Sequence, residues 1–407
     1  MADELTTAAA LTALGGALVA TSAASAQTTL PPPGPKSTGT PGPGEYAGGQ
    51  VRFDRTGIGA NLTFGNFGCT VFKENANTPD WMTANVYFVR KVRNMDIRMP
   101  DGRDLRCWIF EDTLRTSGKR EQLPSATIRV QEDDLVHVKL ESSKGSHTIH
   151  HHGIEPTTMN DGVGHVSMEI TGSYIYQWQP KKAGTYFYHC HKNTVTHFEM
   201  GLYGMLIVDP KPDAQGLVRA YEDGPHYDVE AIWALDDMDP RWHRITDDDH
   251  DVGLCGDDSG LNIFEPKYFL LSGTPSRPGV NVTKQKVVAN AGEQILIRLL
   301  NASYSLLAVT FESLRVQIIA VDGHPLNRPW NRPVTVPPGE TIYLSSAQRY
   351  DIMIDTSLPA NNKKKYKGVN PVTFEFQHWI TRKRHNAGDP LYDGIVRTTI
   401  EFPGWSA

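Results

Sequence analysis

The sequence has few cysteines, no surplus of basic residues and no long apolar run. Its 40 Lys and Arg residues are outnumbered by 46 Asp and Glu residues, and the formal net charge of -6 leaves no basic surface for nucleic acid or anionic lipid. No segment offers the ~20 strongly apolar residues that a membrane-spanning helix needs. Four cysteines in 407 residues exclude a small fold that depends on disulfides. We therefore expect no nucleic-acid partner and no membrane span.

Long heptad or 3.6-residue periodicity is also missing, which argues against a helical fold. Glycine (36 residues) and proline (27 residues) instead separate short alternating segments rich in Val, Ile, Tyr and Phe, a pattern typical of all-β proteins. These segments form two groups, which predict β-sandwich domains at residues 51–210 and 265–407. Residues 211–264 are interpreted as an acidic connector between them.

The N-terminal segment predicts export. Residues 5–20 form a small apolar run, and Ala24-Ser25-Ala26 resembles a signal cleavage site, so residues 1–26 are signal-like. Asp3 and Glu4 stand where basic residues are usual, and a frayed Ala-rich tail is the alternative. Residues 27–50 contain twelve Pro and Gly residues and are interpreted as an extended linker.

Histidine is concentrated in one short region, with eight of the 15 histidines between residues 147 and 197. A strand would turn alternate side chains to the same face, so the spacing places His150 with His152 and His189 with His191, opposite Cys190. One thiolate and two imidazoles with a weak axial ligand bind blue copper. The spacing predicts a blue-copper site and a second, all-imidazole site beside it. The blue-site ligands are His147, Cys190 and His197; the second site has His150, His152, His189 and His191.

His151 is expected to face away from both sites, in a surface or supporting role rather than as a ligand. Outside the blue site, Cys69, Cys107 and Cys255 permit at most one disulfide, whose pairing stays open.

These motifs resemble the multicopper oxidases, and most closely the two-domain, laccase-like members with the blue type 1 copper in domain 1. Residues 147–153 match the family's His-Pro-x-His-x-His-Gly run, with Thr148 in place of proline, and residues 189–191 match its His-Cys-His run. Asp161-Gly162 matches an acidic pair, and Asp161 would support proton delivery; a plain turn residue is the alternative. The resemblance extends over roughly residues 120–400.

The resemblance implies two cupredoxin-like Greek-key β-sandwich domains in an all-β fold. It also implies type 1 copper with additional type 2 and type 3 copper, and a homotrimer. The expected function is an exported, periplasmic or secreted copper oxidoreductase. A small-molecule or protein electron donor would reduce the type 1 copper, and the His-Cys-His run would pass the electrons to the histidine site, which reduces oxygen or another small oxidant.

Two departures from the family pattern qualify this expectation. Leu202 occupies the usual axial Met position and Met200 lies two residues earlier, so either side chain could be axial. After residue 265 the only histidines are His324, His378 and His385, and domain 2 has no His-x-His pair. Two other hypotheses therefore stay open: a non-catalytic blue-copper carrier or copper-binding protein with a degenerate cluster, and a nitrite-reductase-like enzyme with type 1 and type 2 copper.

Overall fold

The computed structural model describes ten stretches of the chain, all within one compact unit, Pro35–Ala407. The described residues are 51–52, 84, 86–114, 121–142, 145–164, 167–211, 219–244, 263–290, 292–355 and 368–403. The signal-like segment, the Pro/Gly linker, Cys69, His165 and Cys255 lie outside these stretches. No helix in the described part of the chain is long and apolar enough to span a membrane.

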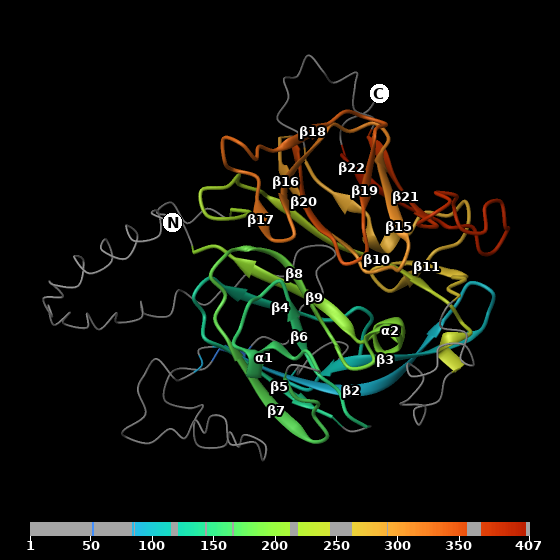
Figure 1. Cartoon of the computed structure of the whole chain (residues 1–407). Coiled ribbons are helices and arrows are strands. Elements are labelled where there is room, and N and C mark those ends of the chain that lie inside the picture. Colours follow the sequence, from blue (N-terminus) through green and yellow to red (C-terminus); the bar gives the residue numbers. More distant parts are fainter. Residues whose placement is uncertain are drawn as a thin grey trace, which may run out of the picture. The chain divides into compact units, whose positions relative to one another are not determined.

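The described fold is all-β, as the sequence predicts, with two short α-helices, α1 (Thr158–Asp161) and α2 (Thr194–Glu199) (Figure 1). The first sandwich has two sheets. One joins β1 (Val51–Arg52), β2 (Val86–Arg98), β5 (Val136–Glu141) and β7 (Ser173–Trp178), with β3 (Asp104–Asp112) on β2. The other has the order β4 (Ser125–Gln131), β9 (Tyr203–Asp209), β8 (Gly184–His189) and β6 (His150–His152).

The core of the first sandwich forms where the alternating apolar side chains of these sheets meet. Tyr176 of β7 and Tyr188 of β8 are fully buried there, and Cys190 belongs to the same cluster. Strands β4, β5, β7, β8 and β9 all lie within the first predicted group of alternating segments, residues 51–210. Alternation of apolar and polar residues was therefore a reliable strand signal in this domain.

The second sandwich has a larger and a smaller sheet (Figure 1). The larger has the order β12 (Thr274–Pro275), β11 (Tyr268–Leu271), β10 (Val229–Met238), β14 (Gln294–Asn301), β20 (Arg349–Asp355), β16 (Val316–Val321) and β17 (His324–Pro325), with β18 (Val334–Val336) on β16. The smaller has the order β13 (Val287–Val288), β22 (Ile395–Glu401), β21 (Val369–Gln377), β15 (Leu306–Phe311) and β19 (Thr341–Leu344). Two 3-10 turns, Trp242–Arg244 and Thr283–Gln285, complete the described elements.

Strand β10 corrects the interpretation of residues 211–264 as a plain connector. It lies between β11 and β14 in the larger sheet, and its pairing with β14 is parallel. The apolar run at residues 231–235 is buried, and the acidic residues around it led the sequence interpretation to a connector. The exact domain boundaries stay a prediction.

The two sandwiches share a buried apolar cluster. Phe187 and Met205 from the β8–β9 pair meet Ile232 of β10 and Leu300 of β14 in this cluster. An apolar contact shared by both sandwiches favours a fixed arrangement of their strands.

A buried ionic network crosses the same contact. Arg129 of β4 donates to Glu230 of β10 at 2.6 Å and to Asp209 of β9 at 2.7 Å. Arg298 of β14 donates to Glu230 at 2.6 Å and to the hydroxyl of Thr185 on β8 at 3.1 Å. Burial alone would raise the pKa of Glu230, but the two guanidinium groups outweigh it and lower the pKa to about 2.

We expect Glu230→Gln to lower the free energy of unfolding by about 1–3 kcal/mol, because Arg129 and Arg298 would lose the carboxylate that they share and keep only Asp209 and Asp351 as acidic partners. The folded-state pKa of about 2 lies below the ordinary value of 4.5, so the wild-type carboxylate stabilises above pH 4.5 and loses this effect as pH falls through 2. Urea unfolding at neutral pH measures the change. Glu340→Gln, at an exposed position, is the control and should change stability by less than about 0.5 kcal/mol. Equal effects of the two substitutions would contradict a role for the network.

Candidate metal centre

Strand β8 sends different side chains to its two faces. Tyr186, Tyr188 and Cys190 belong to the core of the first sandwich, whereas Phe187 belongs to the cluster shared with the second sandwich. His189 follows Phe187 in this alternation, and their rings stack at 5.2 Å. A thiol and an imidazole that are neighbours in sequence therefore face opposite sides of one sheet.

Three potential ligands meet on the Cys190 side. The Sγ atom lies 3.2 Å from Nδ1 of His197 and 3.8 Å from Nδ1 of His147. All three residues are buried, and their donor atoms lie within 4.8 Å of one another. One soft sulfur and two imidazole nitrogens at this spacing fit a trigonal copper site. His147, Cys190 and His197, predicted from sequence spacing, are thus brought together.

Local backbone structure explains how these three residues meet. Helix α2 begins just after Cys190, and the backbone N–H of His197 donates to Asn193 at 3.0 Å, which returns His197 to the thiol. The N–H of Thr148 donates to the sulfur of Cys190 at 3.5 Å. Such a hydrogen bond to a ligand sulfur helps to set the potential of a bound metal.

A second group of imidazoles lies on the opposite face. His150 pairs with His189 across the antiparallel β6–β8 ladder, and Nδ1 of His152 lies 3.4 Å from Nε2 of His189. His150, His152 and His189 place donor atoms within 4.8 Å of one another. The ring of His191 lies 5.4 Å from that of His150 and 5.6 Å from that of His189. The structure thus gathers three of the four predicted imidazoles closely and places the fourth beside them.

Hydrogen bonds orient two of these rings. Nδ1 of His150 lies 2.7 Å from the backbone oxygen of Asp161, and Nδ1 of His189 lies 2.9 Å from the backbone oxygen of Cys190. A carbonyl can only accept, so in each ring Nδ1 carries the proton and Nε2 keeps its lone pair for a metal.

Asp161 and Gly162 support the histidine segment from α1. The carboxylate of Asp161 lies 3.4 Å from Nδ1 of His150 and is partly exposed. Gly162 has a φ of 72°, and a Cβ there would lie 1.9 Å from the backbone oxygen of Ile149. Only glycine allows α1 to approach the segment this closely. Asp161 is therefore placed to orient His150, and its role in proton delivery stays a prediction.

His151 is the middle residue of β6, between His150 and His152. It faces away from His150 and His152, as predicted, but it is fully buried against Tyr176 and Trp178. Of the two predicted roles, burial excludes the surface role and leaves the supporting one, and His151 belongs to neither ligand group.

Burial shifts the pKa values of both groups. It lowers the pKa of His150 and of His189, and with nearby Arg349 it lowers the pKa of His152 to about 3. Burial raises the pKa of the Cys190 thiol to about 11. The three imidazoles are therefore uncharged at neutral pH with lone pairs available, whereas the thiol would release a proton on binding a metal.

The axial position of the first group is not decided by the described contacts. Leu202 and Met200 are both buried in the cluster that contains Cys190. The N–H of Leu202 donates to His197 at 3.1 Å, and the N–H of Cys190 donates to Leu202 at 3.0 Å. Leu202 as the axial residue stays a prediction.

The second sandwich contributes an arginine to the surroundings of the histidine group. The guanidinium of Arg349 packs over Phe187, 5.4 Å from the ring centre. No local sequence pattern marks Arg349 as a site residue, because its position depends on the contact between the two sandwiches. In the described part of the chain, His324, His378 and His385 belong to neither group of potential metal ligands.

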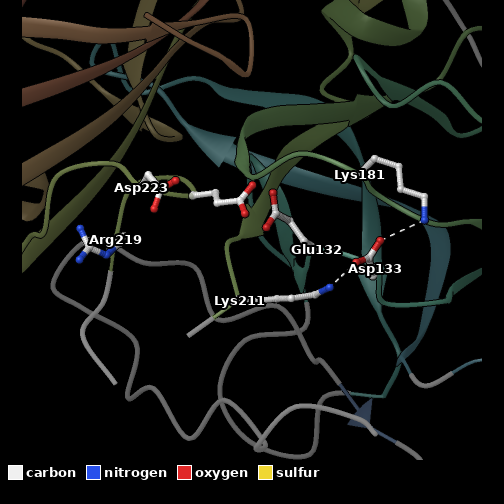
Figure 2. A pocket seen from close by; sticks show the side chains of 7 residues that line it. Glu132, Asp133, Lys181, Lys211, Arg219 and Asp223 are labelled. Atoms are coloured by element: carbon white, nitrogen blue, oxygen red, sulfur yellow. Dashed lines mark hydrogen bonds and ion pairs between the residues drawn. The ribbon is translucent and has the colours of Figure 1, made fainter. Parts of the chain in front are cut away.

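Figure 2 shows a charged cleft whose lining includes Lys181, shortly before β8, and Lys211, shortly after β9. Asp133 pairs there with Lys181 and Lys211, and Glu132 and Arg219 also line the cleft. Asp133 is thus already paired with two lysines, and none of the lining residues is His or Cys. We assign no metal to this cleft.

A family model described as multicopper oxidase matches residues 111–213, which include both histidine groups. L-ascorbate oxidase from Cucumis sativus is 33% identical over 163 residues, covering 38% of this chain and 25% of that protein. Copper resistance protein A from Escherichia coli is 24% identical over 288 residues, covering 61% of this chain and 45% of that protein. The chain thus spans less than half the length of these curated relatives.

The blue copper oxidase from Nitrosomonas europaea is similar in structure over most of both chains. It has a TM-score of 0.56 and 25% sequence identity, and the match covers 78% of this chain and 85% of that chain. The fold, the Cys190 group and the histidine group agree with this relationship, and copper is the metal of such proteins. Residues 111–213 thus match the multicopper oxidase family, and the chain is similar to multicopper oxidases in sequence and in fold.

Proposed function

We propose that this protein is an exported copper-dependent oxidoreductase. His147, Cys190 and His197 would hold a type 1 copper, with Leu202 in the axial position. Electrons from a small-molecule or protein donor would pass through the His189-Cys190-His191 run. The site formed by His150, His152, His189 and His191 would use them to reduce oxygen or another small oxidant.

One observation carries this proposal: Cys190 belongs to one potential copper site while the flanking His189 belongs to the other. The sulfur lies 3.2 Å from Nδ1 of His197, and His189 lies beside His150 and His152. The two sites are therefore joined by a single peptide link. Bound copper would supply one-electron chemistry at the thiolate site and Lewis-acid and redox chemistry at the histidine site.

The residues around the sites exclude water and hold protons. His147 and His197 are each 3% exposed, so the thiolate site is dry. His150 is oriented by Asp161, whose partly exposed carboxylate lies 3.4 Å from Nδ1 and so lies between this ring and solvent-accessible surface. Asp161 is thus suited to proton delivery beside the histidine site.

The oligomeric state and location belong to the same proposal. We propose a homotrimer, by analogy with two-domain relatives, and export to the periplasm or outside the cell, from the signal-like residues 1–26. Among the described residues, the second sandwich places Arg349 beside Phe187 and His152 and adds no histidine to either ligand group.

A second candidate function is a blue-copper electron carrier, or a nitrite-reductase-like enzyme with one type 1 and one type 2 copper. The observation that favours these is the ligand count: in the described residues, only three imidazoles of the histidine site lie within mutual reach. Three imidazoles can hold one copper well, but three coppers would lack ligands.

We expect Cys190→Ser to abolish the intense thiolate-to-copper absorption and leave the fold intact, because a metal ligand is lost without removal of core volume. Optical spectra of the oxidised, copper-loaded variant and circular dichroism measure the two effects. Cys107→Ser is the control, since Cys107 is equally buried but belongs to neither ligand group. A wild-type protein that binds copper and stays colourless would defeat the assignment.

We expect copper affinity at the histidine site to change little between pH 7 and pH 5. The pKa of His152 is lowered to about 3, and burial also lowers those of His150 and His189, so protons compete for these lone pairs less than for those of ordinary imidazoles. Ordinary imidazoles with a pKa of ~6.5 would each weaken binding by roughly 25-fold over the same range. Calorimetric copper titration of Cys190→Ser, which isolates this site, tests the prediction. A large loss of affinity at pH 5, with circular dichroism unchanged, would count against it.

Copper stoichiometry tests the proposed function. We expect more than one but fewer than four coppers per chain, and weak or absent oxidation of phenols, because the chain lacks the histidine pairs for a complete cluster. Elemental analysis and paramagnetic resonance measure the number and type of coppers, and oxygen consumption measures phenol oxidation. Light scattering on the same sample tests the homotrimer. One copper per chain would favour the carrier. Four coppers with brisk phenol-dependent oxygen uptake would support an ordinary laccase, with the missing ligands from another subunit.

A further inference from the structure

Trp108 of β3 packs against both histidines of the proposed type 1 site. Its ring lies 5.1 Å from that of His197 and 6.0 Å from that of His147, edge-on in both cases. Trp108 is 9% exposed and the two histidines are 3% exposed. One indole therefore contacts two potential ligands that solvent barely reaches.

The backbone holds this indole in place. The N–H of Trp108 donates to the backbone oxygen of Met200 at 2.6 Å, which ties β3 to the end of α2, the helix that carries His197. The indole Nε1 is buried and has no hydrogen-bond partner in the described part of the chain. The side chain thus acts through its ring contacts and not through a polar contact.

The orientation of His147 and His197 decides which electron donors can reach their rings. Both Nδ1 atoms are turned to the sulfur of Cys190, so the remaining edges of the two rings are directed away from the metal position. A donor that binds by a hydrogen bond must bring its heavy atom within about 3 Å of an imidazole nitrogen, whereas electron transfer needs only close contact through a covering ring. A buried imidazole edge therefore excludes a donor that must hydrogen-bond to the imidazole, but it still allows electron transfer through the covering ring.

We propose that Trp108 is a specificity-determining cover of the type 1 site. Electrons enter through its indole from one-electron donors that need not touch a ligand imidazole, and donors that hydrogen-bond to the imidazole are disfavoured. In this step the donor loses one electron, the cupric ion gains it, and no proton moves. This inference rests on the proposed function, because it requires copper at His147, Cys190 and His197.

The chain offers a matched control. Trp178 is 3% exposed, its Nε1 also has no partner in the described residues, and its ring packs 4.9 Å from that of His151. His151 belongs to neither ligand group. Replacing Trp178 removes a buried indole from the same sandwich without uncovering a proposed ligand.

The first measurement uses the metal-free protein. Trp108→Ala and Trp178→Ala are treated with diethyl pyrocarbonate, and modified histidines are mapped by mass spectrometry. We expect modification of His147 and His197 to rise about tenfold in Trp108→Ala and to stay at the wild-type level in Trp178→Ala. If Trp108→Ala does not fold, Trp108→Leu takes its place in the same experiment, with the same expected result. If modification of His147 and His197 stays at the wild-type level in the folded Trp108 variant, Trp108 does not cover them and the proposal is wrong.

The second measurement uses the copper-loaded protein. The rate at which the blue absorption is bleached is compared for hexacyanoferrate(II), an outer-sphere donor, and hydroquinone, a hydrogen-bonding donor. We expect the hydroquinone rate to rise about tenfold relative to the hexacyanoferrate(II) rate in Trp108→Ala, and the ratio to stay unchanged in Trp108→Phe.

The reduction potential of each variant separates a cover from a general change at the site. Parallel changes in both rates that follow the potential would overturn the proposal. A wild-type protein that binds copper without blue absorption would overturn the proposed function and the electron-entry part of this inference. In that case, histidine modification in the metal-free protein would still test whether Trp108 shields His147 and His197.

Discussion

The alternation of side chains along β8 is the constraint on which both candidate sites depend. Because successive residues of a strand face opposite sides, Cys190 enters the core of the first sandwich while His189 faces the contact with the second. Pairing of β8 with β6 then places His150 opposite His189. Any shift of register by one residue would exchange the two faces and separate both ligand groups.

Burial supports the chemistry of both sites in opposite ways. It keeps the imidazoles of His150, His152 and His189 uncharged and ready to bind, and it keeps the Cys190 thiol protonated until a metal takes the proton's place. The charges that the fold does bury, around Glu230, are paired in the contact between the sandwiches. Around Glu230, buried charge is thus held in structural ion pairs.

Much of the first sandwich follows from local pattern. The strands around residues 125–209 have clear alternation, and the two ligand groups follow from spacing plus that alternation. Strand β10 was missed because its apolar run is short and lies among acidic residues, so composition suggested a loop. For His151 the choice between a surface and a supporting role stayed open, because strand alternation predicts which way a side chain faces but not what lies opposite it.

The order of residues along 147–197 was enough to predict which side chains share a face, because strand periodicity is a local property of the backbone. Contacts between distant segments needed the tertiary structure. Trp108 lies about forty residues before His147, and Arg349 belongs to another sandwich, yet each packs beside a potential ligand group. Their positions depend on how the sheets pack, which is set by the fit of many side chains and has no signature in a short stretch of sequence.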